Sequence, residues 1–295
     1  MGPRAPTPDP PLDGPALSPQ TVRVPIPILL LVCAPYAAIA VGYLEARRRN
    51  ERAPRWARAL GILTVVVHLG ALVWLGRNTG RSPFQTESQA LSFLAFALAG
   101  LYLVLEATSG VATYGGGFYL LTAVLAGCSV PGLAQEPCAF GSPRGPDPTF
   151  ALHVGFALLG TAAIAAGGLL AVGYLGVYRK VKTRNLALES LEGPSLFGLQ
   201  RLARDASLAG LLLLGPSLVL GWMVLSRMSV GIGVARLEMA LSALQFGLVL
   251  AAGLLWWRWP LRGAVAAWLN IAALLVAIAG LGVVHPLLVG GAGAG

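Results

Sequence analysis

Charged side chains are scarce in this sequence. They make up 11% of the 295 residues, whereas hydrophobic residues make up 56% and the mean hydropathy is +0.73. Soluble domains carry about 25% charged residues, so the composition excludes an ordinary soluble domain and indicates a membrane protein with several spans. The net charge of +9 would suggest a nucleic-acid partner in a soluble protein. Here the basic residues lie beside apolar runs, where they indicate membrane orientation and no nucleic-acid partner.

Cysteine and the common catalytic motifs are also lacking. The three cysteines form no CxxC or CxxCH motif, which argues against covalent attachment of haem to this chain. No phosphate loop, intramembrane pair of acid–base carboxylates or nucleophile motif occurs, so nothing indicates a hydrolase or a kinase. Cys33 lies in an apolar run and is interpreted as a small core residue. Cys128 and Cys138 flank a segment expected outside, where a disulfide can form.

Long apolar runs are abundant and predict an all-α helical bundle in a membrane, over residues 25–289. About 20 apolar residues span the hydrocarbon core as one helix. Residues 1–24 are Pro-rich without hydrophobic periodicity, so a disordered tail is expected there and not a cleaved signal peptide. A flexible Gly/Ala tail is expected at 290–295. The eight candidate spans are 26–45, 58–76, 88–108, 115–131, 150–177, 206–226, 238–257 and 264–288.

The connections between these runs predict the orientation. The first and fifth connections hold six basic residues each, and the seventh adds two. The N-terminal tail and the even-numbered connections together hold seven. Since cytoplasmic loops carry an excess of Lys and Arg, the odd connections are expected inside the cell and both termini outside. The expected location is the inner membrane of a bacterium.

The three histidines all fall in the outer half of the bilayer in this orientation. His153 opens the run 150–177 and His285 closes the run 264–288, so the two are expected at nearly the same depth. His68, in the run 58–76, is expected roughly 8 Å deeper from the helical rise. Two imidazoles at one depth can bind a shared metal ion, or the iron of a b-type haem from both faces.

The alternative interpretation is structural. An imidazole near the interface also reaches water, a backbone carbonyl or a polar group on a neighbouring helix. An ionisable residue within a span is a functional hypothesis by default, yet His68, as a lone histidine, serves equally well to bond a neighbouring helix.

Several segments, taken in order, resemble the cytochrome c assembly protein family, the CcsA/HemX-like integral membrane proteins. "VVHLGALVWLGRNTGRSPFQTESQALSFLAFALAGLYLVLE" is similar to the family's early histidine helix and the span after it. "LHVGFALLGTAAIAAGGLLAVGYL" resembles its helix that opens with an outer histidine. "LEGPSLFGLQRLARDASLAGLLLLGPSLVLGW" and "RWPLRGAVAAWLNIAALLVAIAGLGVVHPLL" resemble its Pro-Ser-Leu connection and its last histidine-bearing span. The resemblance covers about residues 26 to 288.

This resemblance implies a haem-handling protein that binds or relays haem at the outer face for delivery to apocytochrome c. His153 and His285 match the family's paired outer histidines, the axial ligands of the haem iron, and His68 matches its intramembrane histidine. Arg227 and Arg236, in the outer connection before the run 238–257, are candidates to pair with the haem propionates. Their alternative role is solvation in the headgroup layer.

The sequence also departs from the family pattern. The Trp-rich, Asp-ended haem platform is absent, since the stretch "SRMSVGIGVARLEMA" stands in its place, and a second intramembrane histidine near "LLWWRW" is missing. These departures point to the HemX-like branch, to an accessory protein more than a complete haem lyase, and to a membrane partner that supplies the platform. Two rivals stay open: a scaffold or regulator that binds no haem, and a haem or small-molecule transporter, for which Pro216 is a kink candidate.

Overall fold

The computed structural model describes residues 26–49, 51, 54–79, 86–133, 148–183, 195–227, 232–259 and 262–291. In this part of the chain the protein is all-α, as predicted. Its helices, with a short 3-10 turn η1 (Ala112–Tyr114) after the third, are α1 (Ile26–Arg48), α2 (Arg55–Thr79), α3 (Glu87–Ser109), α4 (Gly115–Leu133), α5 (Pro148–Lys182), α6 (Leu196–Arg227), α7 (Ile232–Arg258) and α8 (Gly263–Gly291). Seven of them, α2 to α8, are long and apolar enough to cross a membrane. The protein is therefore a multi-pass membrane protein.

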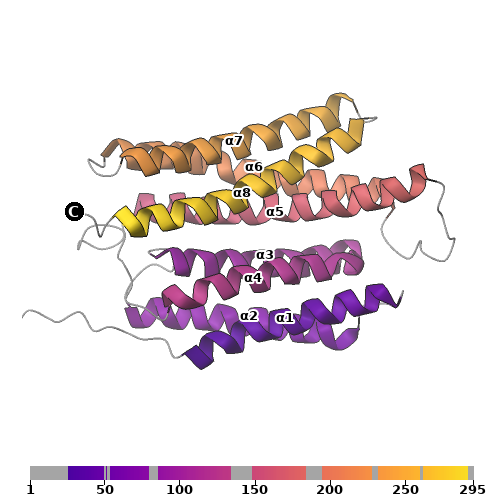
Figure 1. Cartoon of the computed structure of the whole chain (residues 1–295), viewed down its shortest axis with the longest axis horizontal. Helices are drawn as coiled ribbons and strands as arrows, with labels where there is room; N and C mark the ends of the chain where they lie inside the picture. The colour runs from indigo at the N-terminus through magenta and orange to yellow at the C-terminus, as the bar shows by residue number, and fades with distance from the viewer. Residues whose placement is uncertain are drawn as a thin grey trace, which may run out of the picture.

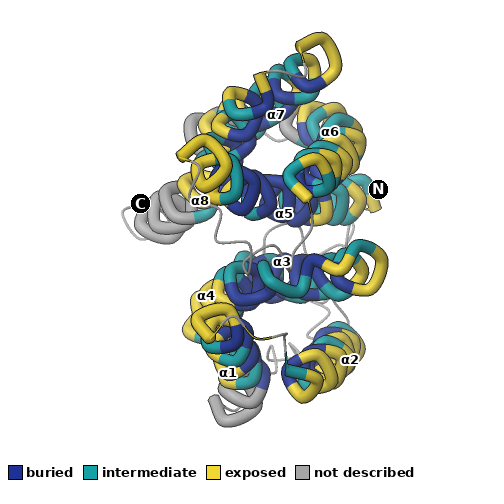
Figure 2. Tube along the Cα trace, turned by 90° about the vertical axis from the view of Figure 1, so that its right-hand side faces the viewer, coloured by how far each residue is buried: buried dark blue, intermediate teal, exposed yellow. Residues whose placement is uncertain are grey.

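The helices form two antiparallel four-helix bundles that lie side by side (Figures 1 and 2). In the first bundle α1 contacts α2 and α4, and α3 contacts the same two helices. In the second bundle α5 contacts α6 and α8, and α7 contacts the same two. The main contact between the bundles runs from α3 to α5, where Leu94 packs with Leu158 and Ala162.

Small residues allow α5 and α6 to approach closely. A Cβ atom added to Gly210 would lie 2.8 Å from the carbonyl oxygen of Gly160, and one added to Gly160 would lie 3.0 Å from the backbone nitrogen of Leu214. Van der Waals packing drives helix association in lipid because water is absent there. The run "GTAAIAAGGLL" in α5 thus makes the close contact that its composition predicts.

One end of the molecule is basic. The ends of α1, α5 and α7 and the starts of α2, α6 and α8 meet at the right of Figure 1. Arg77, at the end of α2, is the basic side chain that the structure describes at the opposite end. The described basic residues of the first end are Arg47, Arg48, Arg49, Arg55, Arg58, Arg179, Lys180, Lys182, Arg201, Arg204, Arg258 and Arg262. We call this the basic end and the other the histidine end.

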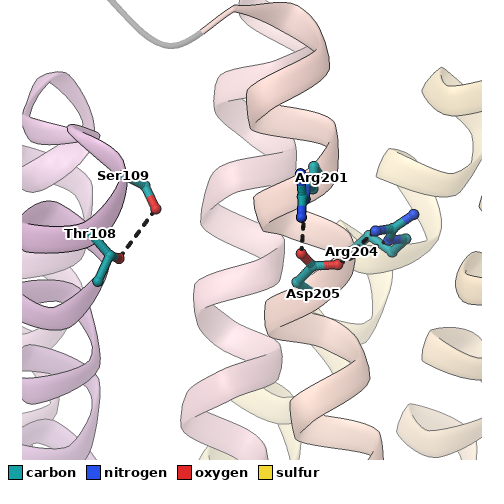
Figure 3. A network of polar contacts seen from close by, with 5 residues as sticks. All are labelled: Thr108, Ser109, Arg201, Arg204 and Asp205. Atoms are coloured by element: carbon teal, nitrogen blue, oxygen red, sulfur yellow. Dashed lines mark hydrogen bonds and ion pairs between the residues drawn. The ribbon is translucent and has the colours of Figure 1, made fainter.

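The hairpin of α5 and α6 is longer than a bilayer requires. With 35 and 32 residues, these helices span roughly 52 and 48 Å at 1.5 Å per residue, against about 30 Å of hydrocarbon. Helix α6 was expected to begin at residue 206 and begins at Leu196, because polar residues extend it past the apolar run. Asp205 there accepts ion pairs from Arg201 (3.6 Å) and Arg204 (2.9 Å), as Figure 3 shows. The exposed pair of Arg201 and Asp205, four residues apart, supports a helix end in water.

Candidate functional site

Polar side chains gather at two places inside the bundles. The first bundle holds His68 with hydroxyl partners, together with a cluster of tyrosines. The second bundle and α3 together enclose a cavity lined by His153. Polar groups within lipid must find hydrogen-bond partners inside the protein. Each place is therefore described by the hydrogen bonds of its side chains.

His68 is almost fully buried in α2, with 2% of its surface exposed. Its Nδ1 lies 3.1 Å from the hydroxyl of Tyr36 on α1, and its Nε2 lies 2.9 Å from the hydroxyl of Ser92 on α3. Both ring nitrogens are thus engaged, and the imidazole joins three helices. These contacts are those of a residue that fastens α2 to its neighbours.

A small cavity beside His68 indicates which nitrogen carries the proton. The cavity, of about 50 Å³, is lined by Ser92 and His68 and extends along α2 and α4 towards the histidine end, to Leu75 and Leu133. Tyr36, His68 and Ser92 share two hydrogen bonds, which leaves one hydroxyl proton without an acceptor among these three residues. Ser92 lines the cavity whereas Tyr36 is fully buried away from it. Ser92 can also turn its proton to the carbonyl four residues earlier in α3, which the longer Tyr36 phenol cannot do. We therefore assign the donors as Tyr36 Oη to Nδ1 and Nε2–H to Ser92.

A cluster of tyrosines extends from Tyr36 towards the basic end. Tyr36 stacks on Tyr119 of α4 with ring centroids 6.1 Å apart, and Tyr119 stacks on Tyr43 of α1 at 5.6 Å. The hydroxyl of Tyr43 donates to both carboxylate oxygens of Glu106 on α3 at 3.0 Å. Tyr102 packs edge-on against Tyr43 and Tyr119. Polar and aromatic groups thus fill the centre of the first bundle.

His153 is held differently, in the first turns of α5. Its Nδ1 lies 2.8 Å from the backbone carbonyl oxygen of Ser217 on α6, and the Ser217 hydroxyl donates to the carbonyl of His153 at 3.0 Å. The Ser217 hydroxyl also lies 3.1 Å from Nδ1. We assign the proton to Nδ1, because the carbonyl can only accept and the hydroxyl already has the His153 carbonyl as its acceptor; Nε2 then keeps its lone pair. No hydrogen bond to Nε2 is made within the described part of the chain. Gly221 leaves room for the ring, since a Cβ there would lie 2.6 Å from Cε1 of His153.

The cavity beside His153 has a volume of about 280 Å³ and is lined by α3, α5, α6, α7 and α8 near the histidine end. Its walls are mostly apolar, and its polar groups include Glu87 of α3 and a stripe on α7 formed by Glu238, Ser242 and Gln245. The Gln245 side chain is 4% exposed, and its amide nitrogen has no hydrogen-bond partner among the described residues. The cavity therefore offers a histidine lone pair, carboxylates and an amide donor to a ligand.

The structure places two of the five sequence-predicted site residues. His68 and His153 lie in different bundles. His285 falls on α8, four residues beyond the cavity-lining Leu281, but its side chain lies outside the described residues, as do those of Arg227 and Arg236. The distance between His153 and His285 thus stays a prediction.

Two polar residues of the site were not predicted from the sequence. Ser217 and Gln245 were missed; the spacing of Glu238, Ser242 and Gln245, at i, i+4 and i+7, was the available signal.

The cysteines add nothing to the site. Cys128 is exposed near the end of α4. Cys138 lies outside the described residues, so the disulfide stays a prediction. In the described part of the chain, no three His, Cys, Asp or Glu residues group to hold a metal ion.

Comparisons with protein-family models, with curated proteins and with solved structures give no match. The class of protein that the fold defines is a multi-pass helical membrane protein with a histidine-bearing cavity between α3 and the second bundle.

Proposed function

We propose that this protein binds haem at its histidine end and relays it during cytochrome c assembly, with His153 as an axial ligand. The observation that carries the proposal is the state of the His153 ring. A protein that binds a metal through one imidazole nitrogen commonly fixes the other by a hydrogen bond to a carbonyl, which sets the tautomer and the ring orientation. The Ser217 carbonyl does this for Nδ1 and leaves Nε2 with a free lone pair.

The cavity fits such a ligand in part. At about 280 Å³ it is near the lower end of the range for ligand pockets, about 300–1,000 Å³, so it takes up an edge of a macrocycle and not the whole. Bound haem would supply an iron that two imidazoles ligate and that changes oxidation state. Arg227 and Arg236 are the proposed partners of the propionates, because guanidinium groups form charge-assisted hydrogen bonds to carboxylates.

His285 is the proposed second axial ligand. Helix α8 lines the cavity through Ala277, Gly280 and Leu281, and position 285 follows Leu281 by one helical turn. Residues four apart share a helix face, which supports the pairing with His153. His68 is assigned no ligand role in this proposal, because both of its nitrogens are engaged in the other bundle.

The remaining parts of the proposal come from the charge pattern and the resemblance in sequence. The described basic residues concentrate at one end, which supports an orientation with that end in the cytoplasm and the histidine end outside. The proposed location is a bacterial inner membrane. A membrane partner of the assembly machinery would complete the haem site, since the Trp-rich platform is missing from this chain.

The experiment is the visible absorption spectrum, oxidised and reduced, of the detergent-purified protein produced with ample haem. Wild type is expected to show sharp reduced bands. His153→Ala and His285→Ala should lose them, whereas His68→Phe should keep them. A folded wild-type protein that takes up no haem, even with added hemin, would refute the proposal.

A glycine pair provides a matched control. Gly221→Ala should displace the His153 ring and change or remove the bands, since the new Cβ would lie 2.6 Å from Cε1. Gly215→Ala, on the same helix, places its Cβ at an ordinary 3.5 Å from Phe246 and should leave the spectrum as in wild type. Equal spectra for both variants would mean that His153 is not a ligand.

A further inference from the structure

The first bundle contains a line of protonatable side chains that the haem proposal does not use. It begins at Glu106 near the basic end and passes through Tyr43, Tyr119 and Tyr36 to His68. All five are 7% exposed or less. Leucines would fill the same space without polar groups to satisfy, and chains of acidic, histidine and similar residues within a membrane commonly mark proton pathways.

The length of this line is a large part of the thickness of a bilayer. Glu106 and Ser92, at its two ends, are fourteen positions apart on the same helix, α3, which corresponds to about 21 Å along the axis. The hydrocarbon core is about 30 Å thick. Beyond Ser92, the small cavity continues to Leu133, at the last residue of α4. The line and the cavity together extend over most of the first bundle's length.

Two hydrogen-bonded segments make up the line. At the basic end Tyr43 donates to Glu106, and towards the histidine end Ser92, His68 and Tyr36 are bonded in series at 2.9 and 3.1 Å. Tyr119 lies between the segments and stacks on a tyrosine of each. Its hydroxyl is buried and has no hydrogen-bond partner among the described residues. The hydrogen bonds are thus interrupted at Tyr119, whose hydroxyl bonds neither Tyr36 nor Tyr43, and a proton crosses this point only when the Tyr119 side chain moves or a water molecule enters.

We propose that the first bundle is a proton pathway between the basic end and the cavity at Ser92. Each step moves one proton and no electron. Glu106 takes up a proton from the basic end and passes it to the Tyr43 oxygen, after the Tyr43 hydroxyl has turned from the carboxylate towards Tyr119. Each tyrosine hydroxyl then releases its proton onward as it accepts the next. His68 accepts at Nδ1 while Nε2 releases its proton to Ser92 and the cavity. Rotation of the hydroxyls and a return of the imidazole to its first tautomer reset the chain.

Proton flux into vesicles tests this proposal. The full-length protein is reconstituted in vesicles of phosphatidylethanolamine and phosphatidylglycerol with a pH-sensitive dye inside, and a potassium gradient with valinomycin supplies the potential. Wild-type vesicles should take up protons faster than protein-free vesicles. Tyr119→Phe and Glu106→Gln should reduce the flux to the protein-free rate. Wild-type flux no faster than that rate would overturn the proposal.

Tyr119→Phe separates a pathway from a structural role. The substitution keeps the stacked ring and removes a hydroxyl that bonds nothing among the described residues, so a structural tyrosine would tolerate it with flux unchanged. Tyr178→Phe, in the stacked Tyr174–Tyr178 pair of α5, is the matched control and should conduct as wild type. Wild-type flux through Tyr119→Phe, or equal loss in Tyr178→Phe, would refute the pathway. The haem spectrum is independent of this result because His153 lies in the other bundle.

Discussion

Replacement of His68 by phenylalanine should destabilise the first bundle, and further replacement of Tyr36 should restore part of the loss. The ring has nearly the size of phenylalanine, so the packing against Phe96, 5.9 Å away between ring centroids, is kept. What is removed is the pair of hydrogen bonds to Tyr36 and Ser92. These bonds tie α2 to both of its neighbours.

The magnitude follows from what each partner can do afterwards. The Ser92 hydroxyl can turn to the carbonyl four residues earlier in its own helix, so its loss is small. The Tyr36 phenol is too long to do the same and stays unpaired, at a cost of roughly 1–3 kcal/mol. Interhelical hydrogen bonds in a membrane couple by about 0.6 kcal/mol on average and about 1.7 at most. His68→Phe should therefore lower the unfolding free energy by about 1–3 kcal/mol.

The assay is reversible unfolding in mixed detergent micelles, followed by circular dichroism, on wild type, His68→Phe, Tyr36→Phe and the double variant. The coupling energy is the departure of the double variant from the sum of the singles. We expect the double variant to be more stable than that sum by about 0.6–1.7 kcal/mol. Additive effects would refute the inference that His68 fastens α2 through Tyr36.

Three further predictions concern other parts of the molecule. Asn270→Leu should lower the unfolding free energy by about 1–2 kcal/mol, because Asn270 of α8 accepts a 2.5 Å hydrogen bond from Ser207 of α6; equal stability would contradict this. Tyr43→Phe should destabilise more than Glu106→Gln in the same assay, since it leaves a buried carboxylate without its donor, and the reverse order would contradict it. Lys182→Cys, with the native cysteines replaced by serine, should react with an impermeant maleimide after cells are permeabilised and not before. Labelling of intact cells would place the basic end outside.

The helices were predictable from sequence because lipid makes the apolar run itself the structural signal. Their ends were less so, and α6 shows why. Its first ten residues, Leu196 to Asp205, hold three charged side chains, Arg201, Arg204 and Asp205, so the apolar run was placed after them. They are helical all the same, since the ion pair of Arg201 and Asp205, four residues apart, supports a helix in water. Hydropathy reports where a helix meets lipid, while hydrogen bonding and charge pairing decide where it stops.

The candidate site was less predictable because the chemistry of a histidine depends on helices far away in the sequence. The separations along the chain are 32 residues for His68 and Tyr36, and 64 residues for His153 and Ser217. Periodicity within one helix contains no information on which neighbour faces it. The polar stripe of α7 was the accessible exception, since Glu238, Ser242 and Gln245 repeat at helical spacing in an apolar run.

Unpaired polar atoms link stability to the proposed functions. A buried hydroxyl without a partner costs roughly 1–3 kcal/mol, so a protein selected for stability alone would not keep the Tyr119 hydroxyl. Tyr119→Phe should therefore raise the unfolding free energy while it abolishes proton flux, the trade-off expected where a site is kept for its activity. Unfolding in micelles and flux in vesicles, measured on the same preparation, check both halves. Greater stability with unchanged flux would mean that the hydroxyl is unused, and lower stability would mean that it has a partner on which folding depends.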